Sequence, residues 1–503
     1  MTTRILGVVL VAMSFAIAPS RVIARDVTFG PGDPVVREAD RLDPKRPIAV
    51  EMQASVPDGF TAAAVGDLII SRPISQLAPQ MPGFAAVIGI LRGTDVAFGN
   101  LETTIFDPRT FDGAPYSWDG DWTNASLPAV AYDLKAMGIG LVGRANNHSQ
   151  DWGLDGMRET AKWLDDAGVV HAGAGESHRM ARAPAYFESP QGRIGLVSIA
   201  STFRPTSESL PPAATAPGRP GLSALRVRET VAAPKSAIEA LAKAQCALYG
   251  KHCDGAPKEG SLFGTSYRQS DRPAREHAMD PGDLAEIHAA IRAAQLNADF
   301  VIVAIHAHEC SLGCDAENAP RGAAGFLKEL ARGAIDSGAD LFVTTGNHNL
   351  GPMEIYDSPG RGKRPIFYGL GNFLWSDVQE FLPADLFARN RDLLDKTWQH
   401  PQRATEYDLT APLNAGYFAN EFTFQSVIAE VRFAGNELSE IVLHPVELGY
   451  GDRLTTSGIP RLVTDPAAAR EITGQIVQQT ALFGLPELGL RHDGARAVIT
   501  VGR

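Results

Sequence analysis

Residues 141–153 read LVGRANNHSQDWG, and an apolar run ends there in amides, an imidazole and a carboxylate. A buried strand that delivers polar side chains at its carboxyl end is how open α/β sheets build binding sites. We therefore expect a strand from Leu141 that leads into Asn147 as a metal ligand, His148 as a general acid and Asp151 as the group that orients it. The alternative is a polar turn whose Asn and Asp side chains bond their own backbone.

The composition indicates a globular protein with an acidic balance. The chain has 503 residues, enough for a large core and more than one layer, and 44% of them are hydrophobic and 21% charged. A formal net charge of −12 argues against nucleic acid as the partner. It does not exclude an anionic polymer or a phosphoester, because a bound metal supplies local positive charge.

The N-terminus has the pattern of a targeting segment. Arg4 precedes an apolar run over residues 5–18, and small-x-small cleavage sites end at Ala18 and Ala24. We expect a signal peptide over residues 1–24 and therefore an exported protein, periplasmic or at the cell surface; an uncleaved anchor is the alternative. Residues 25–58 are rich in Pro, Asp and Arg, and we interpret them as a linker or a strap over the surface.

The four cysteines are Cys246, Cys253, Cys310 and Cys314. In an oxidising compartment an even number of cysteines favours disulfides. Of the three pairings that four cysteines allow, we favour the local ones, Cys246–Cys253 and Cys310–Cys314. A zinc site is less favoured because neither spacing is C-x-x-C.

Short apolar runs alternate with helical spacing over residues 59–375, which we interpret as the main domain. Strands are expected at 60–65, 95–98, 194–200, 300–305 and 341–345, and helices at 126–137, 154–167, 283–294 and 325–335. This alternation favours an α/β fold with a mostly parallel sheet covered on both faces.

Two regions depart from this alternation. Residues 203–281 are rich in proline, and we interpret them as an insertion, a lid stapled by its own disulfide. Residues 376–503 complete the same domain, with a hairpin of the runs 427–433 and 438–443 joined at Gly435-Asn436, and a final helix at 465–480.

Other predicted strands also end in polar chemistry. Asp67 follows the first strand, and Asn100 and Glu102 follow the second. Asn100 and Glu102 are two residues apart, so they face the same side of an extended chain, and a carboxylate so placed could bridge two metal ions. His306 and His308 share one face in the same way after the strand at 300–305.

Several motifs, taken in order, resemble one family. They are Gly66-Asp67, Gly99-Asn100-Leu101-Glu102, Ala145-Asn146-Asn147-His148 with Asp151 and Gly153, residues 171–175, His306, Gly346-x-His348, Glu354-x-Tyr356 and Tyr368-x-x-Gly371-Asn372-Phe373. This series resembles the CapA-type poly-γ-glutamate capsule synthesis proteins, which are similar to calcineurin-like metallophosphoesterases. The resemblance covers roughly residues 60–470, with 203–280 poorly matched. It implies a metallophosphatase-like layered α/β sandwich, in which helices flank mixed sheets, with a Pro-rich insertion and a C-terminal β-hairpin extension.

The resemblance also implies roles for individual residues. Asp67 and His348 would bind one metal, Asn147 and His306 would bind the second, and Glu102 would bridge both. His148 resembles the histidine that protonates the leaving group, with Asp151 orienting it. Further candidates for contacting substrate or supporting the ligands are Asn100, Arg144, Asn146, His308, Glu309, Glu354 and Asn372.

The chain departs from the metallophosphatase pattern at three places. Ile69 stands where those enzymes carry the histidine of Asp-x-His, and Gly346 replaces the first histidine of G-x-H-x-H. The family's His-Trp-Gly reads His306-Ala307-His308 here, so that His308 and the following Glu309 could compensate.

These residues suit hydrolytic metal chemistry. Two cations about 3.5–4 Å apart can hold a hydroxide at neutral pH and stabilise an in-line displacement. Carboxylate, amide and imidazole ligands favour one or two ions of Mn, Fe or Zn. We therefore expect an exported hydrolase that attacks a phosphoester or a γ-glutamyl amide, since poly-γ-glutamate has amide links and no phosphate. The alternative is a non-catalytic module with a degenerate metal site, which binds an anionic polymer and helps the membrane capsule machinery to export or tether it.

Overall fold

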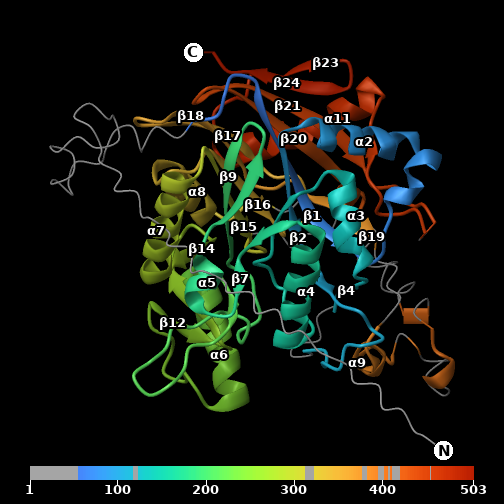
Figure 1. Ribbon diagram of the computed structural model, residues 1–503. Coiled ribbons are helices and arrows are strands. Elements are labelled where there is room, and N and C mark those ends of the chain that lie inside the picture. Colours follow the sequence, from blue (N-terminus) through green and yellow to red (C-terminus); the bar gives the residue numbers. More distant parts are fainter. Residues whose placement is uncertain are drawn as a thin grey trace, which may run out of the picture. The chain divides into compact units, whose positions relative to one another are not determined.

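Two large β-sheets form the centre of this protein (Figure 1). The computed structural model describes residues 55–116, 123–311, 322–376, 382–392, 394, 401–405, 408–409, 420–453 and 455–502. The expected signal peptide, all but the end of the strap at 25–58, and Cys314 lie outside these residues. Within the described ranges we find no helix of the length and apolar character that a membrane span requires.

The larger sheet has ten strands and the smaller has six. The ten-stranded sheet runs in the order β23 (Arg491–Asp493), β24 (Arg496–Thr500), β21 (Glu437–Glu447), β20 (Gln425–Ala434), β1 (Phe60–Ile70), β2 (Val96–Leu101), β5 (Leu141–Gly143) and β6 (Val170–Ala172), with β19 (Asn372–Ser376) paired to β1 and β22 (Arg461–Leu462) to β21. The six-stranded sheet runs in the order β17 (Met353–Ser358), β18 (Gly362–Phe367), β16 (Leu341–Thr345), β15 (Phe300–His306), β9 (Gly192–Ala200) and β8 (Ala185–Ser189).

Side-chain alternation along the strands builds the core between the sheets. Ala62 and Ala64 of β1 belong to the same buried cluster as Phe300 and Ile302 of β15, so the two sheets pack face to face. The residues between them on β1, such as Ala63, point the other way and pack under helices. Both sheets are therefore buried on both faces, which explains why their central strands are continuous apolar runs.

Helices cover the two outer faces (Figure 1). The helices α2 (Pro82–Gly93) and α3 (Ala129–Met137) pack on the ten-stranded sheet, and α7 (Pro281–Asn297) and α8 (Phe326–Asp336) pack on the six-stranded one. Helix α7 begins where Asp280 accepts hydrogen bonds from the first backbone amides. Helix α3 and helix α4 (Gly153–Ala167) end at glycines with a left-handed backbone, Gly138 and Gly168.

Shorter elements connect these layers. They are β3 (Thr104–Ile105), β4 (Ala125–Ser126), β7 (Ala174–Gly175), α5 (His178–Arg182), β10 (Gly221–Leu222) and α9 (Ala384–Arg389), and the last helix is α11 (Pro466–Leu482). Strand β4 pairs with β3, so the helix expected from residue 126 begins only at Ala129.

A β-bulge in β1 sets the direction of Asp67. Ala64 pairs with Phe98 of β2, but the next pair is Asp67 with Asn100, so β1 has one more residue than β2 over this step. The extra residue shifts the alternation by one position. Asp67 therefore faces inward, on the side of Ala62 and Ala64, together with Asn100.

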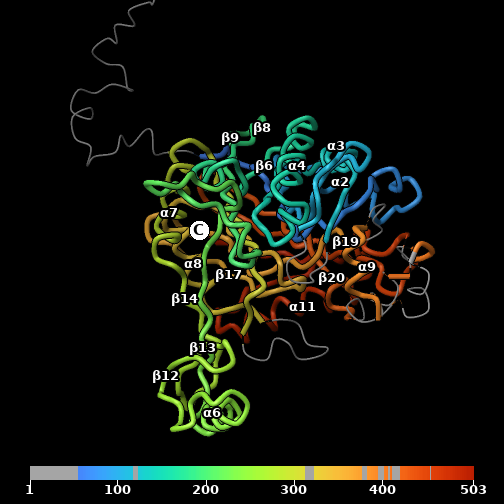
Figure 2. The backbone as a smooth tube through the Cα atoms, turned by 90° about the horizontal axis from the view of Figure 1, so that it is seen from below, coloured from blue at the N-terminus to red at the C-terminus, as the bar shows by residue number. Residues whose placement is uncertain are grey.

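Residues 227–279 form an arm with its own sheet, in the order β12 (Glu259–Leu262), β13 (Thr265–Gln269), β11 (Val227–Ala233) and β14 (Ala274–Met279). Helix α6 (Lys235–Tyr249) packs on it, and the expected disulfide between Cys246 and Cys253 is formed. Figure 2 shows that the arm extends away from the two large sheets. The other expected pair includes Cys314 and lies outside the described residues.

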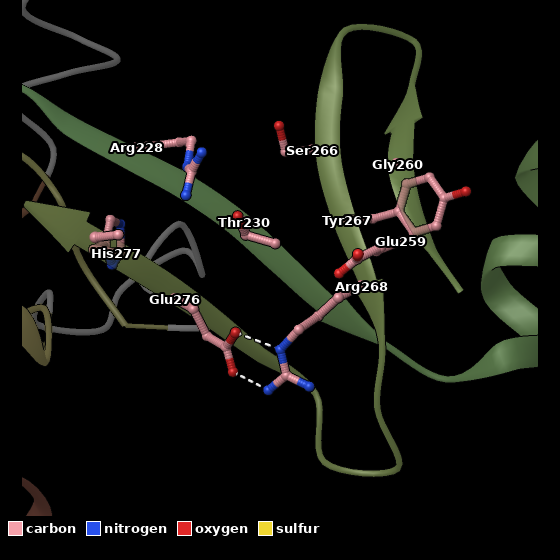
Figure 3. Close-up of a pocket in the computed structure, with 10 residues that line it drawn as sticks. Arg228, Thr230, Glu259, Gly260, Ser266, Tyr267, Arg268, Glu276 and His277 are labelled. Carbon is pink, nitrogen blue, oxygen red and sulfur yellow. Dashed lines mark hydrogen bonds and ion pairs between the residues drawn. The ribbon is translucent and has the colours of Figure 1, made fainter. Parts of the chain in front are cut away.

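The arm carries a cavity of about 610 Å³ (Figure 3). Arg228, Thr230 and Ser266 line it, and Arg268 and Glu276 there form a two-pronged ion pair with each other. Among the described residues that line this cavity there is no candidate site residue from the sequence.

The layered α/β sandwich with mixed sheets is confirmed. The parallel pairing expected from the alternation lies at the centre of each sheet, as in β1–β2–β5 and β9–β15–β16. The hairpin β20–β21 is also confirmed, and it joins β1 antiparallel, which makes the larger sheet mixed.

Candidate metal centre

Asp67 lies at the middle of the site and is fully buried. Its Oδ1 accepts a hydrogen bond from Asn100 Nδ2 at 2.8 Å, and its Oδ2 accepts one from the backbone N–H of Gly346 at 2.9 Å. Burial acts to raise the pKa of Asp67, but the adjacent side chains of His306 and His348 outweigh it and hold the pKa well below its ordinary value. The carboxylate is therefore ionised at neutral pH.

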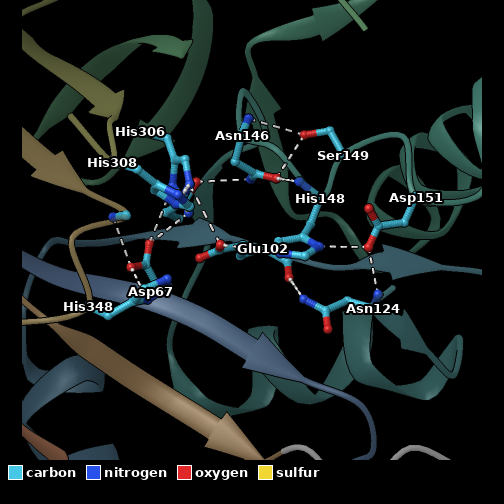
Figure 4. Close-up of polar contacts among 12 residues, drawn as sticks. Asp67, Glu102, Asn124, Asn146, His148, Ser149, Asp151, His306, His308 and His348 are labelled. Atoms are coloured by element: carbon cyan, nitrogen blue, oxygen red, sulfur yellow. Dashed lines mark hydrogen bonds and ion pairs between the residues drawn. The ribbon is translucent and has the colours of Figure 1, made fainter. Parts of the chain in front are cut away.

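Glu102 and His306 adjoin Asp67 on the inner face (Figure 4). His306 ends β15 in the inward-facing register, with Nε2 3.6 Å from Glu102 Oε1 and Nδ1 3.7 Å from Asp67 Oδ1. Burial lowers the pKa of His306, although Asp67 acts in the other direction, and the lowered pKa favours the neutral imidazole that a metal binds. One ligand atom from each of Asp67, Glu102 and His306 lies within 4.8 Å of the others.

His348 completes the site from the turn after β16. Its Nδ1 lies 3.5 Å from Asp67 Oδ2 and 2.8 Å from Asn372 Oδ1. Its backbone has a φ of 57°, in the left-handed region, which costs a residue with a side chain roughly 1–2 kcal/mol. Such strain is kept where the surrounding structure requires a side chain at one place, and it clusters at functional sites.

His308 lies between these groups. Its Nε2 is 3.0 Å from His306 Nε2, and its ring centroid is 5.5 Å from that of His348. Burial, followed by the neighbouring His306 and His348, lowers the pKa of His308 well below its ordinary value. Ligand atoms of Glu102, His308 and His348 also lie within 4.8 Å of one another.

His148 and Asp151 form a pair at the edge of this cluster (Figure 4). His148 Nδ1 is 2.7 Å from Asp151 Oδ2, and its Nε2 is 3.9 Å from Glu102 Oε1. Asp151 also accepts the backbone N–H of Asn124 at 2.6 Å and pairs with Arg204 Nη2 at 2.9 Å. His148, three residues away, and two groups from distant parts of the chain, Asn124 and Arg204, thus hold the Asp151 carboxylate in one orientation.

The adjacent amides have different surroundings. Asn146 donates to Asn100 Oδ1 and to the backbone oxygen of Leu101, and its own Oδ1 accepts the backbone N–H of His148. It therefore fixes the turn. The Oδ1 of Asn147 is buried and has no hydrogen-bond partner among the residues that the structure describes.

The remaining candidates support the site or lie apart from it. Arg144 is buried, donates to the backbone oxygen of Met157 at 2.6 Å, and burial lowers its pKa to about 10. Glu309 accepts hydrogen bonds from Ser201 and Thr202, so it anchors the loop after β15.

Glu354 was a candidate for contact with substrate or ligands, and it serves the outer layer instead. Its carboxylate accepts the Tyr368 hydroxyl at 2.8 Å and pairs with Arg332 of α8. The three side chains join β17, the segment after β18, and α8.

Packing explains both absent histidines. Ile69 is buried in an apolar cluster with Trp375, Phe424 and Leu448. A Cβ at Gly346, whose φ is 93°, would lie 2.9 Å from atoms of the His306 ring. The backbone at residue 346 therefore has no room for a side chain while His306 keeps its place.

Arg204 and Asn124 lie outside the motifs. Arg204 is 2% exposed at its side chain, and it reaches Asp151 through tertiary folding from the start of the expected insertion. This contact cannot be predicted from residue spacing, because the two residues are far apart in the chain and no helical or strand period relates them. The only signal in the sequence is an arginine beside a proline-rich stretch.

The donor set fits a divalent transition metal. It combines buried carboxylates with imidazoles, which is the mixture that Mn, Fe and Zn accept. The buried Asn147 oxygen adds a donor whose hydrogen-bonding capacity the described residues leave unused.

A layered α/β sandwich that gathers such donors at the carboxyl ends of its strands belongs to the metallophosphatase-like class. The chain is a member of the bacterial capsule synthesis protein family, PGA_cap, whose sequence profile matches residues 61–377. The family expected from the motifs is thereby confirmed.

The chain is also similar to individual proteins. The uncharacterized protein y4sH of Sinorhizobium fredii is 40% identical over 445 residues, which are 86% of this chain and 92% of that protein. The PGA biosynthesis protein CapA of Bacillus subtilis is 24% identical over 321 residues, 63% of this chain and 64% of that protein. The crystal structure of a hypothetical protein from Thermus thermophilus is similar with 12% identity and a TM-score of 0.35, over 77% of this chain and 99% of that chain.

Proposed function

We propose that this protein is an exported, metal-dependent hydrolase of capsule or poly-γ-glutamate metabolism, which cleaves a phosphoester or a γ-glutamyl amide. The observation that carries the proposal is the His148–Asp151 pair, whose Nε2 lies 3.9 Å from Glu102 beside a cluster of potential metal ligands. A histidine that a carboxylate orients beside potential metal ligands is the arrangement of a general acid that protonates a leaving group.

The residues that would hold the metal are Asp67, Glu102, Asn147, His306 and His348. When bound, divalent ions polarise the scissile group and make a nucleophile available at neutral pH. Asn100 and the backbone of Gly346 keep the Asp67 carboxylate pointing at the cluster, and Asn372 does the same for His348.

His148 would protonate the leaving group. Asp151 would accept a hydrogen bond from Nδ1–H of His148, so that Nε2 faces the cluster and its proton could move to the departing oxygen or nitrogen. Arg204 pairs with the other oxygen of Asp151, Oδ1, and the backbone N–H of Asn124 donates to Oδ2 beside His148, so the carboxylate is held in the orientation that His148 needs.

Export is supported by two independent features. The pattern at residues 1–24 is that of a signal peptide. The Cys246–Cys253 disulfide on the arm is of a kind that persists in oxidising compartments.

The test compares leaving groups in His148→Ala. For phenyl phosphate or a γ-glutamyl oligomer, whose leaving groups need a proton, kcat should fall about 10²–10⁴-fold. For p-nitrophenyl phosphate, whose leaving group departs as a stable anion, the loss should be much smaller. His492→Ala is the matched control, because it removes an imidazole from β23, four strands from β1. Equal losses for all substrates, or none, would remove His148 from the mechanism.

One observation favours a second function, a non-catalytic module that binds an anionic polymer for export or tethering at the membrane capsule machinery. Ile69 and Gly346 leave two positions of the metallophosphatase pattern without an imidazole. This alternative predicts a purified protein with no transition metal and no turnover of either substrate class.

A further inference from the structure

We infer that His308 is a metal ligand, and that Glu102, His308 and His348 form the second of two ion positions, which shares Glu102 with a first position made by Asp67, Glu102 and His306. The inference rests on the proposed metal-dependent function and deepens it. It assigns His308 the role left open by Ile69 and Gly346.

The geometry separates the donors into two groups of three. Asp67, Glu102 and His306 offer ligand atoms within 4.8 Å of one another, and so do Glu102, His308 and His348. Glu102 belongs to both groups, which is the arrangement that a carboxylate bridging two ions requires. His308 is therefore the third donor of the second group, beside Glu102 and His348.

The backbone places His308 on this side of the sheet. It follows His306 by two residues, so in extended chain both rings face the cluster, and their Nε2 atoms are 3.0 Å apart. The backbone N–H of His308 donates to Thr202 Oγ1 at 2.8 Å, and Thr202 donates in turn to Glu309. The loop after β15 is thus fixed at the residue that carries the ring.

Packing explains why positions 69 and 346, where metallophosphatases carry a histidine, do not accommodate an imidazole in this chain. A Cβ at Gly346 would meet the His306 ring at 2.9 Å. At Ile69 the side chain is enclosed by Trp375, Phe424 and Leu448. His308 instead approaches from the loop after β15, where the neighbouring Ala307 is small and turns away into the core under α8.

A merely structural role for His308 is the competing explanation, in which its ring only hydrogen-bonds His306. The two roles differ in what glutamine can replace. His308→Gln keeps a polar group that can bond His306, but it removes the imidazole nitrogen, which is the stronger donor of the two to a transition metal. His308→Ala removes both functions.

The experiment measures metal content and affinity of the full chain, by elemental analysis after dialysis and by titration of the metal-free protein with Mn²⁺ and Zn²⁺. The wild type and the control His492→Ala should bind about two ions, and His308→Ala and His308→Gln about one. Thermal unfolding of each metal-free form checks that the variants fold, and His308→Gln decides the matter if His308→Ala does not.

The outcomes are distinguishable. If the wild type binds transition metal and either folded His308 variant binds the same number of ions with unchanged affinity, the role of His308 is overturned while the proposed function stands. If the wild type binds none, the proposed function itself fails, and this inference with it.

Discussion

Gly346→Ala tests how closely residue 346 packs against the His306 ring. The added Cβ would lie 2.9 Å from Cε1 and Nε2 of His306 and 3.0 Å from Nδ1, at a φ of 93°. The left-handed backbone costs a non-glycine residue roughly 1–2 kcal/mol. Displacing a packed ring adds about 1–3 kcal/mol. The free energy of unfolding should therefore fall by roughly 2–5 kcal/mol.

Gly168→Ala isolates the clash. Gly168 has a similar φ of 69°, but a Cβ there would meet nothing within 4 Å. It should lose only the backbone part, so the two variants should differ by about 1–3 kcal/mol in urea unfolding of the metal-free proteins. Because His306 moves only in Gly346→Ala, that variant alone should also bind metal at least about tenfold more weakly, which corresponds to about 1.4 kcal/mol.

Two results would refute this reasoning. One is a Gly346→Ala protein no less stable than Gly168→Ala, since the close approach to His306 would then have no energetic meaning. The other is a Gly346→Ala protein that binds metal as tightly as the wild type, since His306 would then not be a ligand held by its surroundings.

Three further predictions concern the surroundings of the site. Arg204→Met leaves the Asp151 carboxylate buried without its partner, and it should cost about 3–5 kcal/mol of stability and lower kcat about 10–100-fold at unchanged metal content. Burial and the charge of Arg144 lower the pKa of His171 to about 3, below the ordinary value of about 6.5. As the pH falls below about 6.5, His171 binds a proton in the unfolded chain but not in the folded protein. By pH 5.5 this difference should lower the free energy of unfolding by about 1.4 kcal/mol, and the effect should be absent in His171→Asn. Cys246→Ser opens a disulfide of sequence separation 7 and should cost the arm about 2.5 kcal/mol, seen as faster hydrogen exchange there.

Each of these has a contradicting result. An Arg204→Met protein with wild-type kcat would show that Asp151 needs no fixed orientation. Parallel stability curves for the wild type and His171→Asn from pH 7 to about 5 would show that His171 is protonated in the folded protein. Hydrogen exchange in Cys246→Ser that quickens equally in β1 and in the arm would show that the arm does not unfold as a separate unit.

The strand ends that carry the candidate site could be predicted, because each is an apolar run followed directly by carboxylate, amide or imidazole side chains. Parallel strands bring their carboxyl ends to one edge, so Asp67, Glu102, His306 and His348 were expected together, and the structure places them together. Their roles as ligands remain a prediction. The β-bulge before Asp67 could not be predicted from the hydrophobic pattern of β1, because the extra residue is defined only by the pairing of β1 with β2.

Other features of the fold were not predicted from the sequence, for different reasons. Helix α2 was not predicted, although Phe84, Val87, Ile88 and Leu91 are all buried and have helical spacing. The arm was expected only as a loose proline-rich insertion, because its short strands have one open face and little apolar alternation. Arg204 contacts Asp151 only in the folded protein, so local sequence motifs do not predict this contact.

The most direct test of the account is the metal content of the full chain, purified without added metal and dialysed against metal-free buffer, in parallel with Asp67→Asn. The account predicts about two equivalents of Mn, Fe or Zn in the wild type, and a clear loss in the variant, because Asp67 is the ionised carboxylate at the centre of the cluster. A folded wild type that holds no transition metal and takes up none on titration would contradict it.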